Sequence, residues 1–306
     1  MQAGGIQMNK KWLAMGSVGI GVVMLVTSGL SVSASYTGYE AYKGALKQTR
    51  AVDSISGNLR VMVSDNSEKV LQVTSAFKKN NEQDASSAVV QLDNGTEKHV
   101  VNMYRQDEKT IVKSSDSDVY HVIEKQGTPW KHEDGNPEMA EEMEKVIDAL
   151  VGNLRNNVTL ENQANGKKKV SLHLAGNQVP GAVNAIGSLI IKKASTHHEK
   201  AESSWHQGKG ANAIHDMKVD LPKLTDNIHV QEVNLDATIN AENYFESQAV
   251  EIKITGQDAS GKDHQVTVVL DAVLSGLNQT MPDQIDLSGK QVQTIQREDW
   301  KQHRSW

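Results

Sequence analysis

The sequence predicts an α+β fold in which about eleven strands form one largely antiparallel sheet and about three helices lie on one face of it. Three observations predict it. Runs in which apolar and polar residues alternate recur along most of the chain, and three other stretches carry apolar residues three and four positions apart. The connections between the alternating runs are short, which favours a strand meander over a parallel sheet with helical crossovers.

The first predicted helix spans residues 38–52. Thr37 stands where a helix N-cap is expected, and Glu40 follows it at the spacing of a capping box. Five residues then recur at three- and four-residue intervals and form one stripe: Tyr39, Tyr42, Leu46, Thr49 and Val52. The helix is therefore expected to bury this stripe against another element.

Two further helices are predicted later in the chain. Asn136 and Pro137 indicate the start of the second, with Asn136 as N-cap and proline at the first helical position. Its apolar face consists of Met139, Met143, Val146, Ile147, Leu150 and Leu154. The third begins near Pro180 and carries Val183, Ile186, Leu189 and Ile190. The third is less polar than the others and is expected to be better buried.

The predicted strands alternate clearly enough to give the sheet one dry face and one wet face. They are residues 59–63, 69–78, 86–93, 97–105, 109–114, 117–124, 157–164, 168–175, 233–240, 250–254 and 266–272. Asp93-Asn94-Gly95-Thr96 and Asn165-Gly166 have the composition of hairpin turns. Ala259-Ser260-Gly261-Lys262 is the predicted turn between the last two strands.

Residues 35–296 are expected to form a single domain, because no linker clearly divides this part of the chain. Within it, residues 195–226 are polar and show no clear period, which predicts a long or partly ordered excursion. The charged segment 297–306 is expected to be a frayed, polar tail.

The N-terminus, residues 1–34, has the pattern of an export signal. Lys10 and Lys11 form a basic start, a run of mainly apolar and small residues follows, and Ala34 ends a small-residue cleavage site. The same run, residues 12–32, is also just long enough, at about 20 residues, to remain as a membrane anchor. The rest of the chain is therefore expected outside the cytoplasm, either secreted or tethered to the outer face of the cytoplasmic membrane.

Composition narrows the possible classes of function. The chain has no cysteine, so it carries no disulfide, no thiol nucleophile and no lipid-bearing cysteine of the bacterial lipoprotein type. Its formal net charge of −6 makes nucleic acid an unsuitable partner. With only two Phe, the core is expected to be mainly Val, Leu, Ile and Ala.

The sequence predicts neither an enzyme nor a cofactor or metal site. It contains no nucleophile elbow, and the histidines of the 195–226 segment do not follow a zinc-protease pattern: His197, His198, His206 and His215. Histidines in a polar loop are usually solvated, although a metal site is the alternative interpretation. Asp116 and Asp118 resemble the start of a calcium loop, but the glycine and the distal glutamate are missing, so a turn is predicted there.

Two stretches carry a resemblance to known families. The segment Tyr39-Glu40-Ala41-Tyr42-Lys43, continued by Leu46-Lys47-Gln48-Thr49 into the strand at Ser56–Ser64, resembles the LolA and LppX-type carriers of lipoproteins and lipids. Thr280–Lys290 is similar to secreted proteins of unknown function from Gram-positive bacteria. The resemblance covers residues 36–292 through the order of elements. It implies a curved, half-open barrel with helices at its opening and an apolar ligand between sheet and helices.

This resemblance implies an exported, non-enzymatic protein that binds a lipid-like ligand or a lipidated partner. The residues it places at the ligand cavity belong to the first and third helices: Tyr39, Tyr42, Leu46, Val183, Ile186 and Ile190. The chain departs from many such carriers in lacking the anchoring cysteine, so any anchor must lie in residues 12–32. The alternative is an extracytoplasmic sensory or regulatory domain with a closed core that contacts a membrane protein complex.

Overall fold

The structure, a computed structural model, describes residues 37–124, 157–181 and 221–295. These residues form one α-helix, twelve strands and two short 3-10 helices. The elements are α1 (Gly38–Arg50), β1 (Ser54–Asp65), β2 (Glu68–Asn80), β3 (Ala85–Asp93), β4 (Lys98–Gln106), β5 (Lys109–Ser114), β6 (Tyr120–Glu124), β7 (Val158–Asn162), η3 (Ala164–Gly166), β8 (Lys168–Ala175), η4 (Gly176–Gln178), β9 (Leu224–Ile239), β10 (Phe245–Asp258), β11 (Asp263–Ser275) and β12 (Val292–Ile295).

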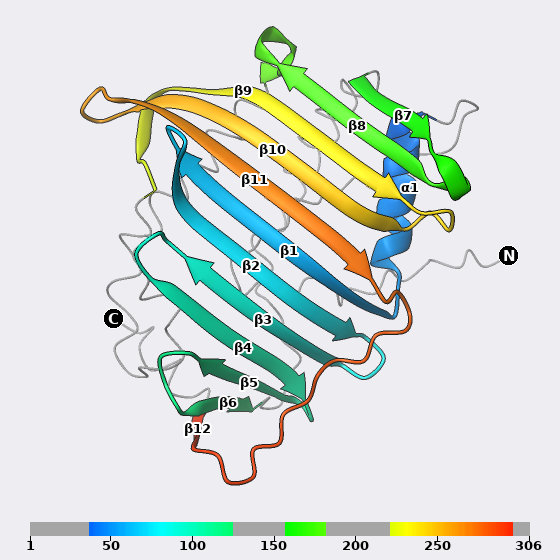
Figure 1. Cartoon of the computed structure of the whole chain (residues 1–306), viewed down its shortest axis with the longest axis vertical. Helices are drawn as coiled ribbons and strands as arrows, with labels where there is room; N and C mark the ends of the chain where they lie inside the picture. Colours follow the sequence, from blue (N-terminus) through cyan, green and yellow to red (C-terminus); the bar gives the residue numbers. More distant parts are fainter. Residues whose placement is uncertain (1–36, 125–156, 182–220, 296–306) are drawn as a thin grey trace, which may run out of the picture.

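All the described strands belong to one open, curved sheet (Figure 1). Their order is β12-β6-β5-β4-β3-β2-β1-β11-β10-β9-β8-β7. Every neighbouring pair is antiparallel except β12 and β6, which run parallel. The predicted antiparallel meander is therefore confirmed, but the eleven predicted strands omit β12. The structure describes one α-helix where three were predicted, and the other two fall outside the described residues.

Helix α1 begins and buries its side chains as its sequence predicts. The backbone N–H of Glu40 donates to Thr37 Oγ1 at 3.3 Å, which satisfies one of the free donors of the first turn. The helix ends at Arg50 rather than at residue 52. The residues of the predicted stripe are all buried: Tyr39, Tyr42, Leu46, Thr49 and Val52.

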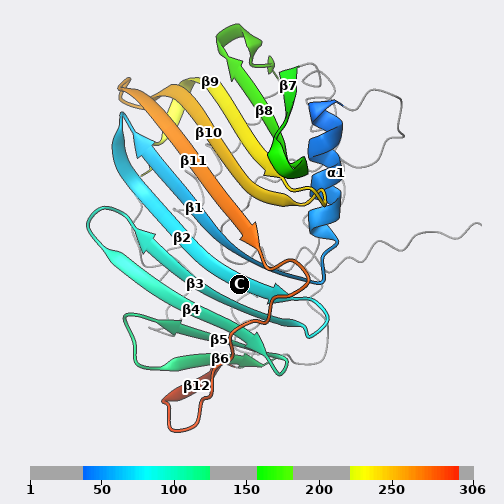
Figure 2. The ribbon, with the colours of Figure 1, turned by 45° about the vertical axis from the view of Figure 1, so that its right-hand side comes forward.

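The sheet has two chemically different faces. We call the face on which α1 packs the helix face; Figure 2 shows α1 on this side of the sheet. Val61, Leu270 and Val250 lie in register on this face across β1, β11 and β10. The opposite face, which we call the outer face, carries charged pairs such as Arg60 with Asp271, whose nearest charged atoms are 2.6 Å apart. This division is the expected result of period-two alternation.

Packing is densest where α1 covers the sheet. Residues of α1 and of β8 to β11 form the main core cluster, and Val170, Leu174, Ile239 and Phe245 are almost completely buried in it. A smaller cluster of Val73, Val90 and Leu92 lies on β2 and β3. Both clusters therefore lie on the helix face.

Two meanders make up the sheet, and one strand pair joins them. Strands β1 to β6 form the first meander and β7 to β11 the second, and β1 pairs with β11 from Ser56↔Ser275 to Asp65↔Val266. We call this β1–β11 pair the seam. It brings together residues that are distant in sequence, since Arg60 and Asp271 are 211 positions apart.

A strap, defined as residues 276–291, connects β11 to β12 along the ends of β1 to β4 (Figure 1). Polar side chains at these strand ends hold it. The Thr280 N–H donates to Ser54 Oγ at 2.9 Å, and the Asp283 N–H donates to Ser87 Oγ at 2.9 Å. Further along, the Ile285 N–H donates to Gln106 Oε1 at 2.8 Å. The strap thus places β12 beside β6, at the far edge of the sheet.

The structure confirms the three predicted turns and corrects one boundary. Asp93–Thr96 joins β3 to β4, Asn165-Gly166 joins β7 to β8, and Ala259–Lys262 joins β10 to β11. The irregular segment expected to reach residue 226 ends before residue 224. Strand β9 begins at Leu224, where it pairs with β10.

Other predicted features fall outside the described residues. They are the N-terminal segment 1–34, the four histidines of the polar excursion and the tail 297–306. In the part of the chain that the structure describes, no helix is both long enough and apolar enough to cross a membrane.

Candidate functional site

The apolar surface of the helix face continues beyond α1. The helix packs mainly on β7 to β10, whereas apolar side chains continue on the helix face of β11, β1, β2 and β3. We call this continuation the apolar strip; it consists of Val61, Val63, Leu71, Val73, Ala88, Val90, Leu92, Val268 and Leu270. Several of its members, including Val61, Leu71 and Ala88, are only half-buried. The strip is therefore the candidate surface for an apolar ligand.

Three of the predicted cavity residues lie on the buried side of α1. Tyr39, Tyr42 and Leu46 are 7%, 8% and 3% exposed. Tyr42 packs its ring against Phe245 of β10, with centroids 4.9 Å apart, and Leu46 belongs to the same core cluster. The structure thus shows a packing role for these residues, and ligand contact stays a prediction. Val183, Ile186 and Ile190 lie outside the described residues.

Two buried polar groups lie on the helix face, one on α1 and one on β10. Tyr42 Oη and Gln248 Nε2 are buried, and neither has a hydrogen-bond partner among the described residues. Gln248 follows Phe245 on the helix face of β10, and its neighbour across β11 is the half-buried Ala272. Burial raises the pKa of Tyr42 to about 12, so this hydroxyl stays neutral. Both groups can donate hydrogen bonds.

Gln248 was not among the predicted site residues, although its sequence context indicates a buried polar group. It occupies a helix-face position in the alternating run that continues with Val250, Ile252 and Ile254. A polar residue at an apolar position of such a run points to a buried polar group, and these are uncommon without a partner.

His121 of β6 is a third buried polar group on the helix face. It is 2% exposed, and neither ring nitrogen has a hydrogen-bond partner among the described residues. Its register neighbours are Val112 of β5 and Gln293 of β12. Burial lowers the pKa of His121, because the charged ring would be poorly solvated there. The ring is therefore neutral at pH 7.

Replacing His121 with leucine is expected to raise the free energy of unfolding by about 1–3 kcal/mol, the cost of a buried polar group without partners. Because the folded pKa of His121 is lowered, its unfolded form binds more protons, so wild-type stability falls as pH drops below the ordinary histidine value of 6.5. The part of the fall in stability at low pH that is due to His121 should disappear in His121→Leu. Urea unfolding at several pH values measures both effects. The exposed His229 provides the control, His229→Leu, and equal changes in the two variants would contradict the assignment.

The outer face carries a shallow groove over the seam. Two cavities of about 270 Å³ and 380 Å³ share Asn58, Ala76 and Val89 in their lining. One is bordered by the Arg60–Asp271 pair and the other by Lys78 and Asp283 of the strap, whose charged atoms are 2.6 Å apart.

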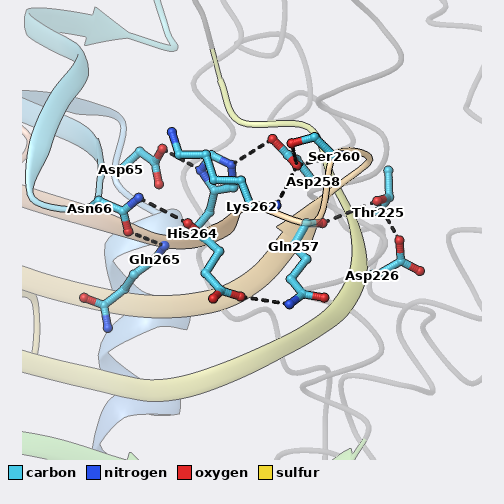
Figure 3. Close-up of polar contacts among 11 residues, drawn as sticks. Asp65, Asn66, Thr225, Asp226, Gln257, Asp258, Ser260, Lys262, His264 and Gln265 are labelled. Carbon is cyan, nitrogen blue, oxygen red and sulfur yellow. Dashed lines mark hydrogen bonds and ion pairs between the residues drawn. The ribbon is translucent and has the colours of Figure 1, made fainter.

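A buried histidine between two carboxylates lies at the tips of two hairpins (Figure 3). His264 is 8% exposed; its Nδ1 lies 2.7 Å from Asp65 Oδ2, and its Nε2 lies 3.3 Å from Asp258 Oδ2. Asp258 also accepts hydrogen bonds from the Ser260 hydroxyl and from the Lys262 N–H, at 2.6 Å and 3.0 Å. These bonds hold the pKa of Asp258 well below its usual range.

The arrangement around His264 does not have the geometry of a nucleophilic triad. The Ser260 hydroxyl donates to Asp258 and not to His264, so the imidazole has no serine proton to accept. Burial lowers the pKa of His264, but the hydrogen bonds to Asp65 and Asp258 outweigh burial and leave the pKa above 6.5. The cluster is therefore suited to binding a proton.

A second histidine–carboxylate contact lies at the same end of the sheet. His99 Nδ1 is 2.5 Å from Asp116 Oδ2, and this bond is the main cause of the raised pKa of His99. Asp116 lies in the turn between β5 and β6, as predicted for Asp116 and Asp118. Within residues 37–124, 157–181 and 221–295, no three His, Asp or Glu side chains form a group that could hold a metal ion.

Comparisons with known proteins identify no family. No family model matches the chain, and no curated protein matches it. A LolA superfamily protein from Nitrosomonas europaea is 8% identical over 82% of this chain and 96% of its own, with a TM-score of 0.23. A tesB protein from Mycobacterium avium subsp. paratuberculosis is 12% identical over 81% of this chain and 91% of its own, with a TM-score of 0.13. At TM-scores this low, neither likeness bears on function.

Proposed function

We propose that this is an exported, non-enzymatic protein that binds a lipid-like ligand or a lipidated partner on its helix face, between sheet and helices. One observation carries the proposal: the apolar strip continues over β11, β1, β2 and β3, beyond the strands on which α1 mainly packs. Covering apolar surface is favourable by about 25 cal/mol per Å². A flexible apolar chain is a suitable occupant, because it can follow the half-buried side chains of the strip.

The polar groups beside the strip support a ligand with one polar end. Tyr42 Oη and Gln248 Nε2 are neutral donors that lack partners among the described residues. A ligand with an acceptor oxygen, such as an acyl carbonyl, would accept a hydrogen bond from either donor, and its hydrocarbon part would lie along the strip. Export is supported by the basic start and apolar run of residues 1–34.

A matched pair of tryptophan substitutions tests the location of the ligand. Ala88 of β3 lies on the helix face opposite Phe77, whereas Ala76 of β2 lies on the exposed outer face opposite Val89. We expect Ala88→Trp to weaken binding of a pyrene-labelled diacyl lipid to the delipidated protein at least about tenfold, or about 1.4 kcal/mol. Ala76→Trp should leave the affinity unchanged, because it adds bulk to the other face.

Fluorescence titration gives the two affinities, and thermal unfolding verifies that both variants remain folded. Native mass spectrometry of protein purified from its own host should show a bound lipid that is reduced in Ala88→Trp. Equal affinities for the two variants would place the ligand elsewhere. A wild-type protein that neither copurifies with lipid nor binds the probe would refute lipid binding altogether.

A further inference from the structure

The hairpin-tip end of the seam is held by side chains as well as by the strand pairing. Asn66, in the turn after β1, donates its backbone N–H to Gln265 O at 3.0 Å and accepts the Gln265 N–H on Oδ1 at 3.0 Å. Beside it, Asp65 of β1 contacts His264 of β11, which also contacts Asp258 at the end of β10 (Figure 3). His264 thus connects the first meander to two strands of the second.

These contacts require a protonated ring. Each ring nitrogen of His264 faces a carboxylate oxygen, and only the imidazolium form has an N–H on both nitrogens. Loss of the proton would place a lone pair of the buried ring against one of the two carboxylates. A lone pair repels the carboxylate that an N–H would have donated to. Deprotonation therefore weakens the connection across the seam.

The surrounding charges favour the proton. Asp65 of β1 and Asp258 of β10 raise the pKa of His264, whereas Lys262, in the turn between β10 and β11, lowers it. Other charged residues near these hairpin tips are Glu68 and Lys69 of β2, Lys223 just before β9, Asp226 of β9 and Asp263 of β11. Asp263 accepts a hydrogen bond from Gln257 Nε2 at 2.9 Å. Among these residues five are acidic and three are lysines, so acidic side chains are in excess around His264, which is consistent with an imidazolium.

The cluster lies at one end of the apolar strip. Asp65 pairs with Val266, which is a helix-face residue of β11. His264 lies two residues before Val266 on the same strand, so the side chains of Asp65 and His264 both belong to the helix face. Gly256 of β10 is the register partner of His264. A change in this cluster would therefore alter the seam beside the apolar strip.

We propose that Asp65, His264 and Asp258 form a proton-operated latch that closes the hairpin-tip end of the seam when His264 is an imidazolium. The latch opens as pH rises and the ring loses its proton. Its action depends only on the charge of His264 and on contacts across the seam, so it does not rest on lipid binding.

The pH window follows from the raised pKa of His264 in the closed state. The stabilisation of the closed seam by the His264 proton is complete below the ordinary histidine value of 6.5. It falls between pH 6.5 and the closed-state pKa of His264, and it is absent above that pKa. Within this window the opening equilibrium constant rises by up to about tenfold per pH unit. At the other end of the seam the Ser56 and Ser275 hydroxyls meet at 3.0 Å, a contact whose charge does not change in this pH range, so this end should not respond.

Nuclear magnetic resonance of the full, ligand-free chain tests the latch. The ring signals of His264 give its pKa, and hydrogen exchange of the amides in residues 63–66 and 264–267, corrected for intrinsic rates, gives the opening equilibrium from about pH 5.5 to about pH 8.5. We expect His264 to titrate above 6.5 and protection at these amides to fall in step. Amides near Ser56 and Ser275 serve as the internal reference.

Two variants make the test decisive. His264→Gln should open this end of the seam at every pH and remove its pH dependence, whereas His173→Gln, an exposed substitution on the outer face, should behave as wild type. If His264→Gln does not fold, Asp65→Asn should still lower the His264 pKa and move the opening to lower pH. Protection that is independent of pH in wild type, or a His264 that titrates below 6.5, would overturn the latch.

Discussion

Replacing Phe245 with alanine is expected to lower the free energy of unfolding by about 3–5 kcal/mol, the range for a fully buried aromatic residue. Phe245 is 1% exposed and packs against the ring of Tyr42. Its backbone N–H also donates to Thr49 Oγ1 at 2.9 Å, so β10 contacts α1 through both ring and main chain. The substitution would leave a cavity that α1, fixed by Thr49, cannot fully close.

Urea unfolding followed by circular dichroism measures this loss. Val273→Ala is the matched control, because Val273 is 53% exposed on the outer face and its truncation should cost no more than about 0.5 kcal/mol. Similar losses in the two variants would mean that α1 is not anchored through Phe245.

Gly38→Ala and Gly44→Ala are expected to change stability in opposite directions, although both glycines belong to α1. A Cβ on Gly38 would lie 2.6 Å from Thr159 O and 2.9 Å from Val158 O, so α1 would have to move away from β7. We expect a loss of about 3 kcal/mol, at the upper end for overpacking, because the obstructing atoms belong to the backbone. A Cβ on Gly44 meets nothing within 4 Å, and alanine there should stabilise the helix by about 0.5–1 kcal/mol.

The comparison of the two glycine variants uses thermal and urea unfolding of each. Their difference of about 4 kcal/mol follows from position alone, since the substitution and the helix are the same. If Gly38→Ala were as stable as wild type, the contact between the start of α1 and β7 would not form in solution.

The local features of the fold could be predicted from the sequence because the signals that determine them are local. The Thr37 cap, the buried stripe of α1 and the Asn165-Gly166 turn each depend on residues a few positions apart. Asn165 and Gly166 have φ values of 59° and 74°, the left-handed conformation that asparagine and glycine adopt most readily. The alternation in β10 and β11 likewise determined which side chains face the core.

The long-range features could not be predicted, because their partners are distant in sequence. The strap has no regular period, and its contacts, such as Thr280 with Ser54, join residues 226 positions apart. Strand β12 has only four residues, too few for a pattern to indicate it. His264 and Asp65 are also unremarkable in the sequence, and only the register of the seam brings them together.

The seam also has a consequence for how the chain folds. Within each meander most hairpins close short loops, and the longest connection, between β8 and β9, runs from Ala175 to Leu224. The pairing of Arg60 with Asp271 must close a loop of 211 positions, at an entropic cost of about 5 kcal/mol. Each meander can therefore form before the two meet, and the β1–β11 pairing is the slow, late step. Until then β1 and β11 are free edges that can pair with the same strands of another copy. The strap, which follows β11 directly, favours the partner in its own chain.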